Sequence, residues 1–189
     1  MSKRQALKKK NKKNNGQKLK WTRIREIFIP NGWLNQTKTD ENDVNALEHD
    51  YALLKLKKSI GGQPIKLGLS PELAEIPGNK RIHFTAYEDT KFMPRLYYRS
   101  CHVQNQTNHL IYHECDSVRS SAGAGIYVRK YNDVTKKLER RVIGVYSGEQ
   151  WIELGGGQTK EYNTGVRLTK LKLAQICLWR TGSEKSCNN

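Results

Sequence analysis

Six short segments in the second half of the chain mix apolar and polar residues in near alternation, the period-two pattern of half-buried β-strands. They read RIHFTAY, RLYYRSCHV, HLIYHEC, GIYVRKY, RRVIGVYS and YNTGVRL. Turn signals such as Tyr131-Asn132-Asp133 and Gly155-Gly156-Gly157 separate several of them. Strands of this length and spacing predict an all-β barrel or sandwich.

Three more elements flank this series. The stretch WTRIREIFIPNGWL predicts a strand over about 21–29 that ends at a Pro-Asn-Gly turn. The run DYALLKLKK suits a short buried strand, because Ala52, Leu53, Leu54 and Leu56 are apolar. The last element, TKLKLAQICLWR, predicts a helix that stops at Gly182. Its apolar residues recur near helical spacing at Leu171, Leu173, Ile176 and Trp179.

The positive charge of the chain lies mainly at its start. The formal net charge is +16, and residues 1–20 hold nine Lys and Arg with no Asp or Glu. Such a segment predicts a disordered basic tail. The interpretation we prefer for residues 3–20 is a solvated linker; the alternatives are binding of a polyanion such as a heparan-type glycan or of nucleic acid, and a nuclear import signal. No aromatic residues are interleaved for base stacking, so nucleic acid is not the partner we expect.

Composition and short motifs also bear on the compartment. No apolar stretch approaches the roughly 20 residues needed to span a bilayer, so we expect no membrane insertion. The residues after Met1 contain no hydrophobic region of a secretory signal peptide. Four cysteines in two close pairs and the glycosylation sequons at Asn35 and Asn105 nevertheless favour a secreted protein that has lost its front end.

The cysteines leave two interpretations open. Cys101, His109, His113 and Cys115 form a cluster with the composition of a zinc site, and His113 and Cys115 would share one strand face. Cys101 and Cys115 also lie on consecutive strands in a hairpin-like arrangement, which fits a disulfide equally well.

Three stretches in order carry a family resemblance: HDYALLKLKK, then CDSVRSSAGAGIYV, then VIGVYSGEQW followed by NTGVRLTKLKLAQICLW. Together they resemble the second half of a chymotrypsin-like, trypsin-type serine protease, and the match extends from Trp21 to Cys187. The resemblance implies an all-β chymotrypsin-like fold with a C-terminal α-helix. It divides the chain into a basic tail at 1–20, part of a first barrel at 21–58, a linker at 59–79 and a complete second barrel with the helix at 80–187. The chain would then be truncated at its N-terminus.

The resemblance assigns roles to a few residues. In the family an Asp before a D-x-A-L-L-x-L strand orients the catalytic histidine, and that position is Asp50. The nucleophile loop places its serine at Ala122, whose methyl group cannot attack a carbonyl. Gly123 and Gly125 match the loop, but Ser120 replaces the glycine two residues before the nucleophile. The oxyanion-hole positions are therefore Ser120 and Ala122. Ser121, like Ser120, lies beside the nucleophile position without replacing it.

The histidine that serves as general base in the family is also missing from the residues before Asp50. His49 is the only histidine before Asp50, and as its neighbour on a strand it would point the opposite way. Ser147 and Gly148 resemble the strand along which substrate backbone pairs, and Asn163 to Val166 resemble the back of the specificity pocket. The alternative is that both segments are ordinary core strands of a barrel.

Taken together, the resemblance predicts a catalytically inactive serine protease homologue whose role is binding of a protein or peptide, or none if the chain is an incomplete gene product. An active secreted endopeptidase in a longer form and a polyanion-binding protein acting through its basic tail are the two alternatives. The resemblance implies extracellular location and no cofactor or metal. It also favours two disulfides, which pair Cys101 with Cys115 and Cys177 with Cys187.

Overall fold

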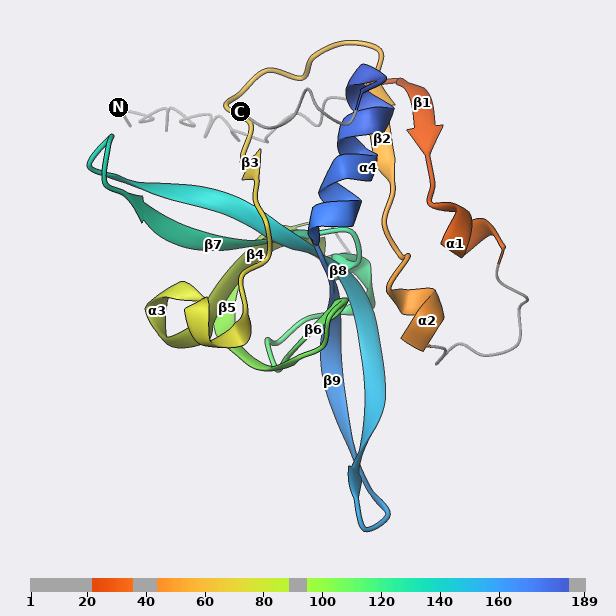
Figure 1. Ribbon diagram of the computed structural model, residues 1–189, viewed down its shortest axis with the longest axis vertical. Helices are drawn as coiled ribbons and strands as arrows, with labels where there is room; N and C mark the ends of the chain where they lie inside the picture. Colours follow the sequence, from red (N-terminus) through yellow and green to blue (C-terminus); the bar gives the residue numbers. More distant parts are fainter. Residues whose placement is uncertain (1–21, 36–43, 89–94, 184–189) are drawn as a thin grey trace, which may run out of the picture.

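The computed structural model describes residues 22–35, 44–88 and 95–183, and its largest unit is a closed six-stranded antiparallel barrel (Figure 1). Its strands are β4 (Arg81–Glu88), β5 (Arg95–Gln106), β6 (Leu110–His113), β7 (Gly125–Asn132), β8 (Lys137–Gly155) and β9 (Gln158–Arg167). Neighbours around the ring run β4, β5, β6, β9, β8 and β7, and the pair His83 and Tyr127 closes it between β7 and β4. The all-β prediction and the positions of all six strands are confirmed.

Strand β8 is much longer than the segment RRVIGVYS predicted. It pairs with β7 from Lys137 to Val145 and with β9 from Gly144 to Gly155, so it belongs to two hairpins. Both hairpins project away from the barrel (Figure 1). The projecting ends are mostly exposed, so no buried face imposes a clear hydrophobic alternation there, and the sequence pattern underestimates the strand.

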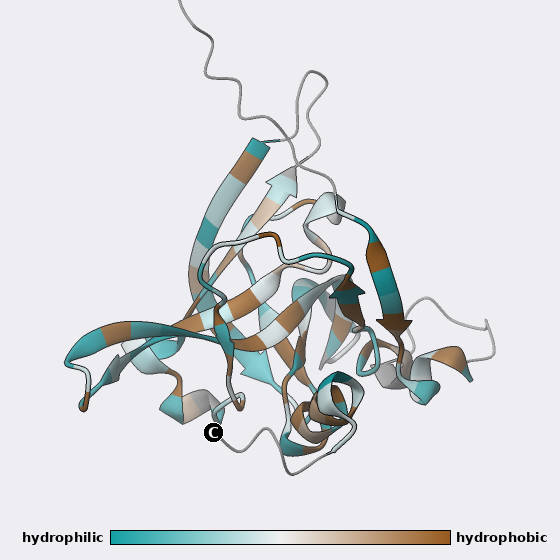
Figure 2. Ribbon diagram, turned by 90° about the horizontal axis from the view of Figure 1, so that it is seen from above, coloured by the Kyte–Doolittle hydropathy of each residue, from teal (hydrophilic) through white to brown (hydrophobic). Residues whose placement is uncertain are grey.

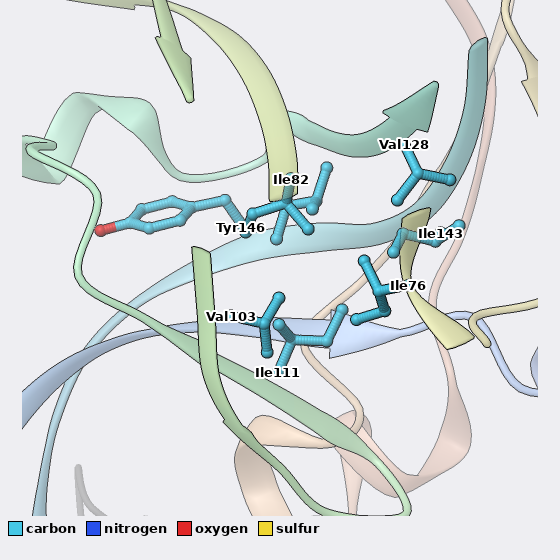
Figure 3. Packing of buried hydrophobic residues seen from close by; sticks show 8 residues of the cluster. Ile76, Ile82, Val103, Ile111, Val128, Ile143 and Tyr146 are labelled. Carbon is cyan, nitrogen blue, oxygen red and sulfur yellow. The ribbon is translucent and has the colours of Figure 1, made fainter. Parts of the chain in front are cut away.

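The barrel interior is filled by branched aliphatic side chains. Ile82, Ile111, Ile126 and Ile143 are almost fully buried and pack with the side chain of Tyr146. Figure 3 shows this cluster, which also includes Ile76, Val103 and Val128. Figure 2 shows the matching alternation of hydrophobic and hydrophilic residues along the strands. The apolar residues that alternate along β4 hold its register, whereas β6 is buried at all four of its positions.

A separate two-stranded sheet precedes the barrel in the chain. Strand β1 (Ile24–Phe28) pairs antiparallel with β2 (Leu53–Leu56), and the short helices α1 (Asn31–Leu34) and α2 (Val44–Leu47) lie between them. The expectation of a buried second strand is wrong, because Leu54 is 49% exposed. Ile27 on β1 is 57% exposed. With only two strands, this sheet has too little partner surface to bury its apolar residues.

The C-terminal helix α4 (Lys170–Thr181) joins the two sheets. The Thr169 side chain accepts a hydrogen bond from Lys172 N at the start of the helix, and Gly182 ends it with a left-handed φ of 74°. Trp179 stacks on Phe28 of β1 with ring centroids 5.9 Å apart. The predicted helix and its stop are confirmed, but its predicted apolar face is wrong at Leu171, which is 82% exposed while Lys172 is buried.

The segment between the two sheets is held against the barrel by one buried arginine. It contains β3 (Lys66–Leu67), the 3-10 turn η1 (Leu73–Glu75) and α3 (Pro77–Lys80), and β3 pairs in parallel with β8. Arg167 donates to the carbonyl oxygens of Thr107, Ser70 and Pro71 and to the Glu72 carboxylate. These charge-assisted bonds fix where the segment crosses the barrel. Among the described residues, no helix combines the length and apolarity that crossing a membrane requires.

Candidate functional site

Asp50 lies at the junction between the two-stranded sheet and the barrel. It follows the turn after α2 and precedes β2 by three residues. The hydroxyl of Ser147, on β8, donates a hydrogen bond to Asp50 Oδ2 at 2.5 Å. The resemblance placed Asp50 and Ser147 in separate parts of the site, and the structure brings them into direct contact.

Asp50 and Ala122 line one hollow of about 410 Å³. Its other walls are mostly apolar and come from both sheets: Ile29, Trp33, Tyr51, Ala52, Leu54, Gly123, Val145 and Tyr146. The carboxylate is therefore one of very few charged groups in a small apolar space. The position that the family gives to the nucleophile presents a methyl group to this space.

The loop that carries Ala122 is fixed to the barrel by its backbone. It contains the 3-10 turn η2 (Arg119–Ser121), after which Gly123 takes a left-handed φ of 85°. Gly123 N donates to Tyr146 O, and Tyr146 N donates to Ala124 O, both at 2.8 Å. These two bonds fasten the loop to β8 and hold Ala122 at the hollow.

The two serines beside Ala122 lie outside the hollow's lining. Ser120 is exposed, and Ser121 is buried with no hydrogen-bond partner for its hydroxyl among the described residues. Residues 120 and 121 belong to the 3-10 turn, and neither is among the residues that line the hollow. The geometry thus offers neither serine as a replacement nucleophile in this hollow.

His49 does not face Asp50 as a base would. Its ring lies against α1, so close to Gly32 that a Cβ added there would fall 2.4 Å from the ring. His49 Nε2 also lies 3.4 Å from the Glu48 carboxylate. His49 lies in the turn after α2 and Asp50 directly follows that turn, so the prediction that they are neighbours on a strand is wrong, although the two side chains do have different partners.

A hydrogen-bonded network lies next to the hollow, on the side of the predicted specificity pocket. The hydroxyls of Ser117 and Tyr146 both approach Asn163 Oδ1, at 2.7 and 2.6 Å, and Asn163 Nδ2 donates to Cys115 O. Burial is the main cause that raises the pKa of Tyr146, so this phenol stays neutral. The pocket strands are adjacent, since Thr164 donates to Gly148 O at 2.9 Å.

The disulfide between Cys101 and Cys115 is confirmed, with the Cα atoms 5.2 Å apart. The two sulfur ligands of the alternative zinc site are therefore bonded to each other, although His113 remains close to both. The fourth member of that cluster is elsewhere, because His109 Nδ1 pairs with Glu48 at 3.0 Å. His113 is fully buried between Phe84 and Tyr146, and burial lowers its pKa to about 4.

Several predicted features fall partly or wholly outside the described residues. Cys187, the partner proposed for Cys177, is one of them, so that pairing stays a prediction. The basic tail at 1–20 is another. Asn35 and Asn105 are exposed, as glycosylation requires, but Thr37 of the first sequon is not described.

Three contributors to the site were missed by sequence reasoning. Trp33 and Ile29 line the hollow, although the sequence indicated only a strand and a turn there. Tyr51 also lines it, and its hydroxyl donates to Gln175 Oε1 on α4, while burial raises its pKa to about 12. The sequence offered one usable signal, the aromatic residue that directly follows Asp50. The contact between Tyr51 and Gln175 could not be predicted, because it depends on how α4 packs against this segment.

Comparison with known proteins supports the resemblance over most of the chain. No family model matches it. The chain is 42% identical over 167 residues to inactive serine protease 35 of Mus musculus, across 88% of this chain and 39% of that protein. It is 39% identical over 170 residues to serine protease 23 of Homo sapiens, across 90% of this chain and 43% of that protein. The chain thus spans about two fifths of the length of the curated relatives it matches.

Proposed function

Because this chain is a serine protease homologue of the trypsin-like family, we propose that it binds an extended peptide beside Asp50 without cleaving it. One relative is named inactive and the other is not, so the names leave the activity of this chain open. The proposal therefore rests on the site itself.

The observation that carries the proposal is the position of Ala122. This residue shares the hollow with Asp50, where the family's nucleophile would stand. Acyl transfer by this family begins with attack of a serine hydroxyl on the scissile carbonyl, and a methyl group has neither lone pair nor proton to give. Asp50 retains the orienting carboxylate, but its partner is the hydroxyl of Ser147. A bound peptide would meet binding groups and no attacking atom.

The edge of β8 supports a peptide ligand. On the side away from β9, the backbone of Tyr146 is bonded to Gly123 and Ala124, and beyond Tyr146 no described strand pairs with β8 on that side. An extended peptide can add to such an edge through main-chain hydrogen bonds while its side chains enter neighbouring pockets. The hollow lies at this edge, since Val145 and Tyr146 form part of its wall. We therefore expect an apolar side chain of the peptide to occupy it.

An extracellular location belongs to the same proposal. The Cys101–Cys115 disulfide forms and persists in oxidising compartments, and the exposed side chain of Asn105 can accept a glycan. Deglycosylation of protein collected from the medium of producing cells tests both points. A single mass shift on treatment would support them, and retention of unmodified protein in the cell lysate would contradict them.

The peptide proposal can be tested by filling the hollow. Ala122→Trp places a large side chain at the exposed loop position, and Val134→Trp adds the same group at a site that is 92% exposed and distant in the fold. Acetylated hexapeptides from a random library are selected on the unmodified full chain and measured against both variants. We expect Ala122→Trp to weaken binding at least about tenfold and Val134→Trp to leave it unchanged.

The same peptides separate binding from catalysis. Intact peptide after prolonged incubation with the full chain supports the proposal, and a defined cleavage product would assign an endopeptidase activity instead. Equal binding by the unmodified chain and Ala122→Trp would show that peptides bind elsewhere.

A further inference from the structure

Two arginines lie directly opposite each other on the outer face of the barrel. Arg129 on β7 and Arg140 on β8 are cross-strand partners in the antiparallel register, and both side chains are exposed. Like charges in this relationship destabilise a sheet. The nearest carboxylate along β8, Glu139, alternates to the other face, where it accepts from Asn132 and Arg141. Among the described residues, no carboxylate forms an ion pair with either arginine to offset the repulsion.

A third arginine adds to the same face. Arg81 on β4 donates to Ser100 Oγ at 3.2 Å and lies 3.4 Å from His102 Nε2. Among the ion pairs of the described residues, none includes Arg81, Arg129 or Arg140. Their recorded partners are hydroxyls, a ring nitrogen and aromatic rings, which leave the guanidinium charges unneutralised.

The three charges converge on one histidine. His83 lies between the rings of Tyr98 and Tyr127, with centroids at 5.9 and 5.3 Å, and its Nδ1 is 2.6 Å from Tyr98 OH. Burial lowers the pKa of His83 first, and the positive fields of Arg129, Arg81 and Arg140 lower it further. All three arginines thus contribute a positive field at His83.

The tyrosines hold the arginines in place. Arg129 donates to Tyr98 OH at 3.3 Å, and the Arg140 guanidinium lies 5.6 Å from the centroid of the Tyr127 ring. Stacking on an aromatic ring leaves the N–H edge of a guanidinium free to bind an oxyanion in bidentate geometry. The face is therefore preorganised for anions and does not depend on flexible lysines.

We propose that this face, formed by Arg81, Arg129 and Arg140 on the outer side of β4, β7 and β8, binds a sulfated glycan. Guanidinium groups match the oxygen geometry of sulfate esters, and several charges in a row suit a repeating polyanion. A single-stranded nucleic acid would need open aromatic faces for its bases. Here Tyr127 is only 5% exposed; Tyr98 is 49% exposed, but its ring stacks on His83 and the Arg129 guanidinium lies 6.0 Å from its centroid. This site is separate from residues 3–20 and from the hollow beside Asp50.

The test compares two variants of the full chain that remove the same charge. Arg129→Gln/Arg140→Gln removes the cross-strand pair, and Arg25→Gln/Lys55→Gln removes two exposed cations that pair with Glu26 on the two-stranded sheet. The probes are a heparin-derived sulfated octasaccharide, its desulfated form and a single-stranded DNA oligonucleotide of equal charge. Dissociation constants are measured at about 50 and about 200 mM salt. Arg81→Gln serves as an independent single variant.

We expect Arg129→Gln/Arg140→Gln to weaken octasaccharide binding about tenfold and to reduce the salt slope by about two. Arg81→Gln should weaken it in the same direction, and the Arg25/Lys55 control should change it less than about twofold. The octasaccharide should also raise the melting temperature of the unmodified chain more than that of the double variant. An equal loss of octasaccharide affinity in both double variants would overturn the proposal, because it would show that binding depends on net charge and not on this face. Tighter binding of the oligonucleotide, lost in the same arginine variants, would assign the face to nucleic acid.

Discussion

The Ser147 hydroxyl donates to the Asp50 carboxylate across 97 residues of sequence, and this bond joins the barrel to the segment that carries the two-stranded sheet. The two residues thereby form one side of the hollow in which Ala122 stands. The bond holds the carboxylate that the resemblance assigns to the catalytic triad beside the position that it assigns to the nucleophile.

Removing that hydroxyl should cost stability. In Ser147→Ala the Asp50 carboxylate loses a partly buried, charge-assisted partner, which typically contributes about 1–3 kcal/mol to the free energy of unfolding. Ser59→Ala is the matched control, because Ser59 Oγ makes only an exposed bond to Gly61 N. Urea unfolding at neutral pH measures both. A Ser147→Ala variant as stable as Ser59→Ala would contradict the structural importance of this contact.

His113 should make the protein sensitive to mild acid. Its pKa falls from 6.5 to about 4 in the folded state because of burial, so between these values the unfolded chain binds a proton that the folded chain does not. The contribution of neutral His113 to the free energy of unfolding is fully present above pH 6.5. It declines as the pH falls toward 4, by up to about 3 kcal/mol. Unfolding free energies across this range should show the slope.

The variant His113→Leu isolates this contribution. This variant should remove much of the slope of unfolding free energy against pH. A smaller slope of the same sign should remain, because the pKa of His83 is lowered as well. An unchanged slope in His113→Leu would mean that other groups cause the acid sensitivity.

The Cys101–Cys115 disulfide should contribute a similar amount to the free energy of unfolding. Cys101 and Cys115 are 14 residues apart, and closing a loop of this size stabilises a fold by about 3 kcal/mol through the unfolded chain. Cys101→Ala/Cys115→Ala should lower the unfolding free energy accordingly. Mass mapping of non-reduced peptides checks this bond and the pairing of Cys177 with Cys187. Free thiols with bound zinc would contradict the pairing scheme.

The sequence predicted the barrel well because its strands bury one face. In RIHFTAY, for example, Ile82, Phe84 and Ala86 are buried while Arg81, Thr85 and Tyr87 are exposed, although His83 is buried as well. Leu54 and Leu171 were placed wrongly, since an apolar residue shows no sign of whether a partner surface exists to cover it. The family resemblance supplied Asp50 and Ala122. The bond from Ser147 and the wall formed by Trp33 depend on packing between distant segments, which no local pattern encodes.

The two-stranded sheet should be the least protected part of the folded chain. Ile24, Ile27 and Leu54 are each about half exposed, and the sheet ends after two strands. Hydrogen exchange should therefore be faster in residues 22–57 than in the barrel strands over 80–168. Equal protection would contradict both this expectation and the predicted division of the chain at residues 58 and 79.

Labelling with a fluorophosphonate probe tests the proposed loss of catalysis most directly. The probe reacts with an activated serine hydroxyl, which the site beside Asp50 lacks at Ala122. The unmodified full chain should not label. Ala122→Ser should also fail, because a serine at this position needs a base and His49 lies against Gly32 instead. Labelling of the unmodified chain, at Ser120, Ser121 or any other serine, would contradict the account.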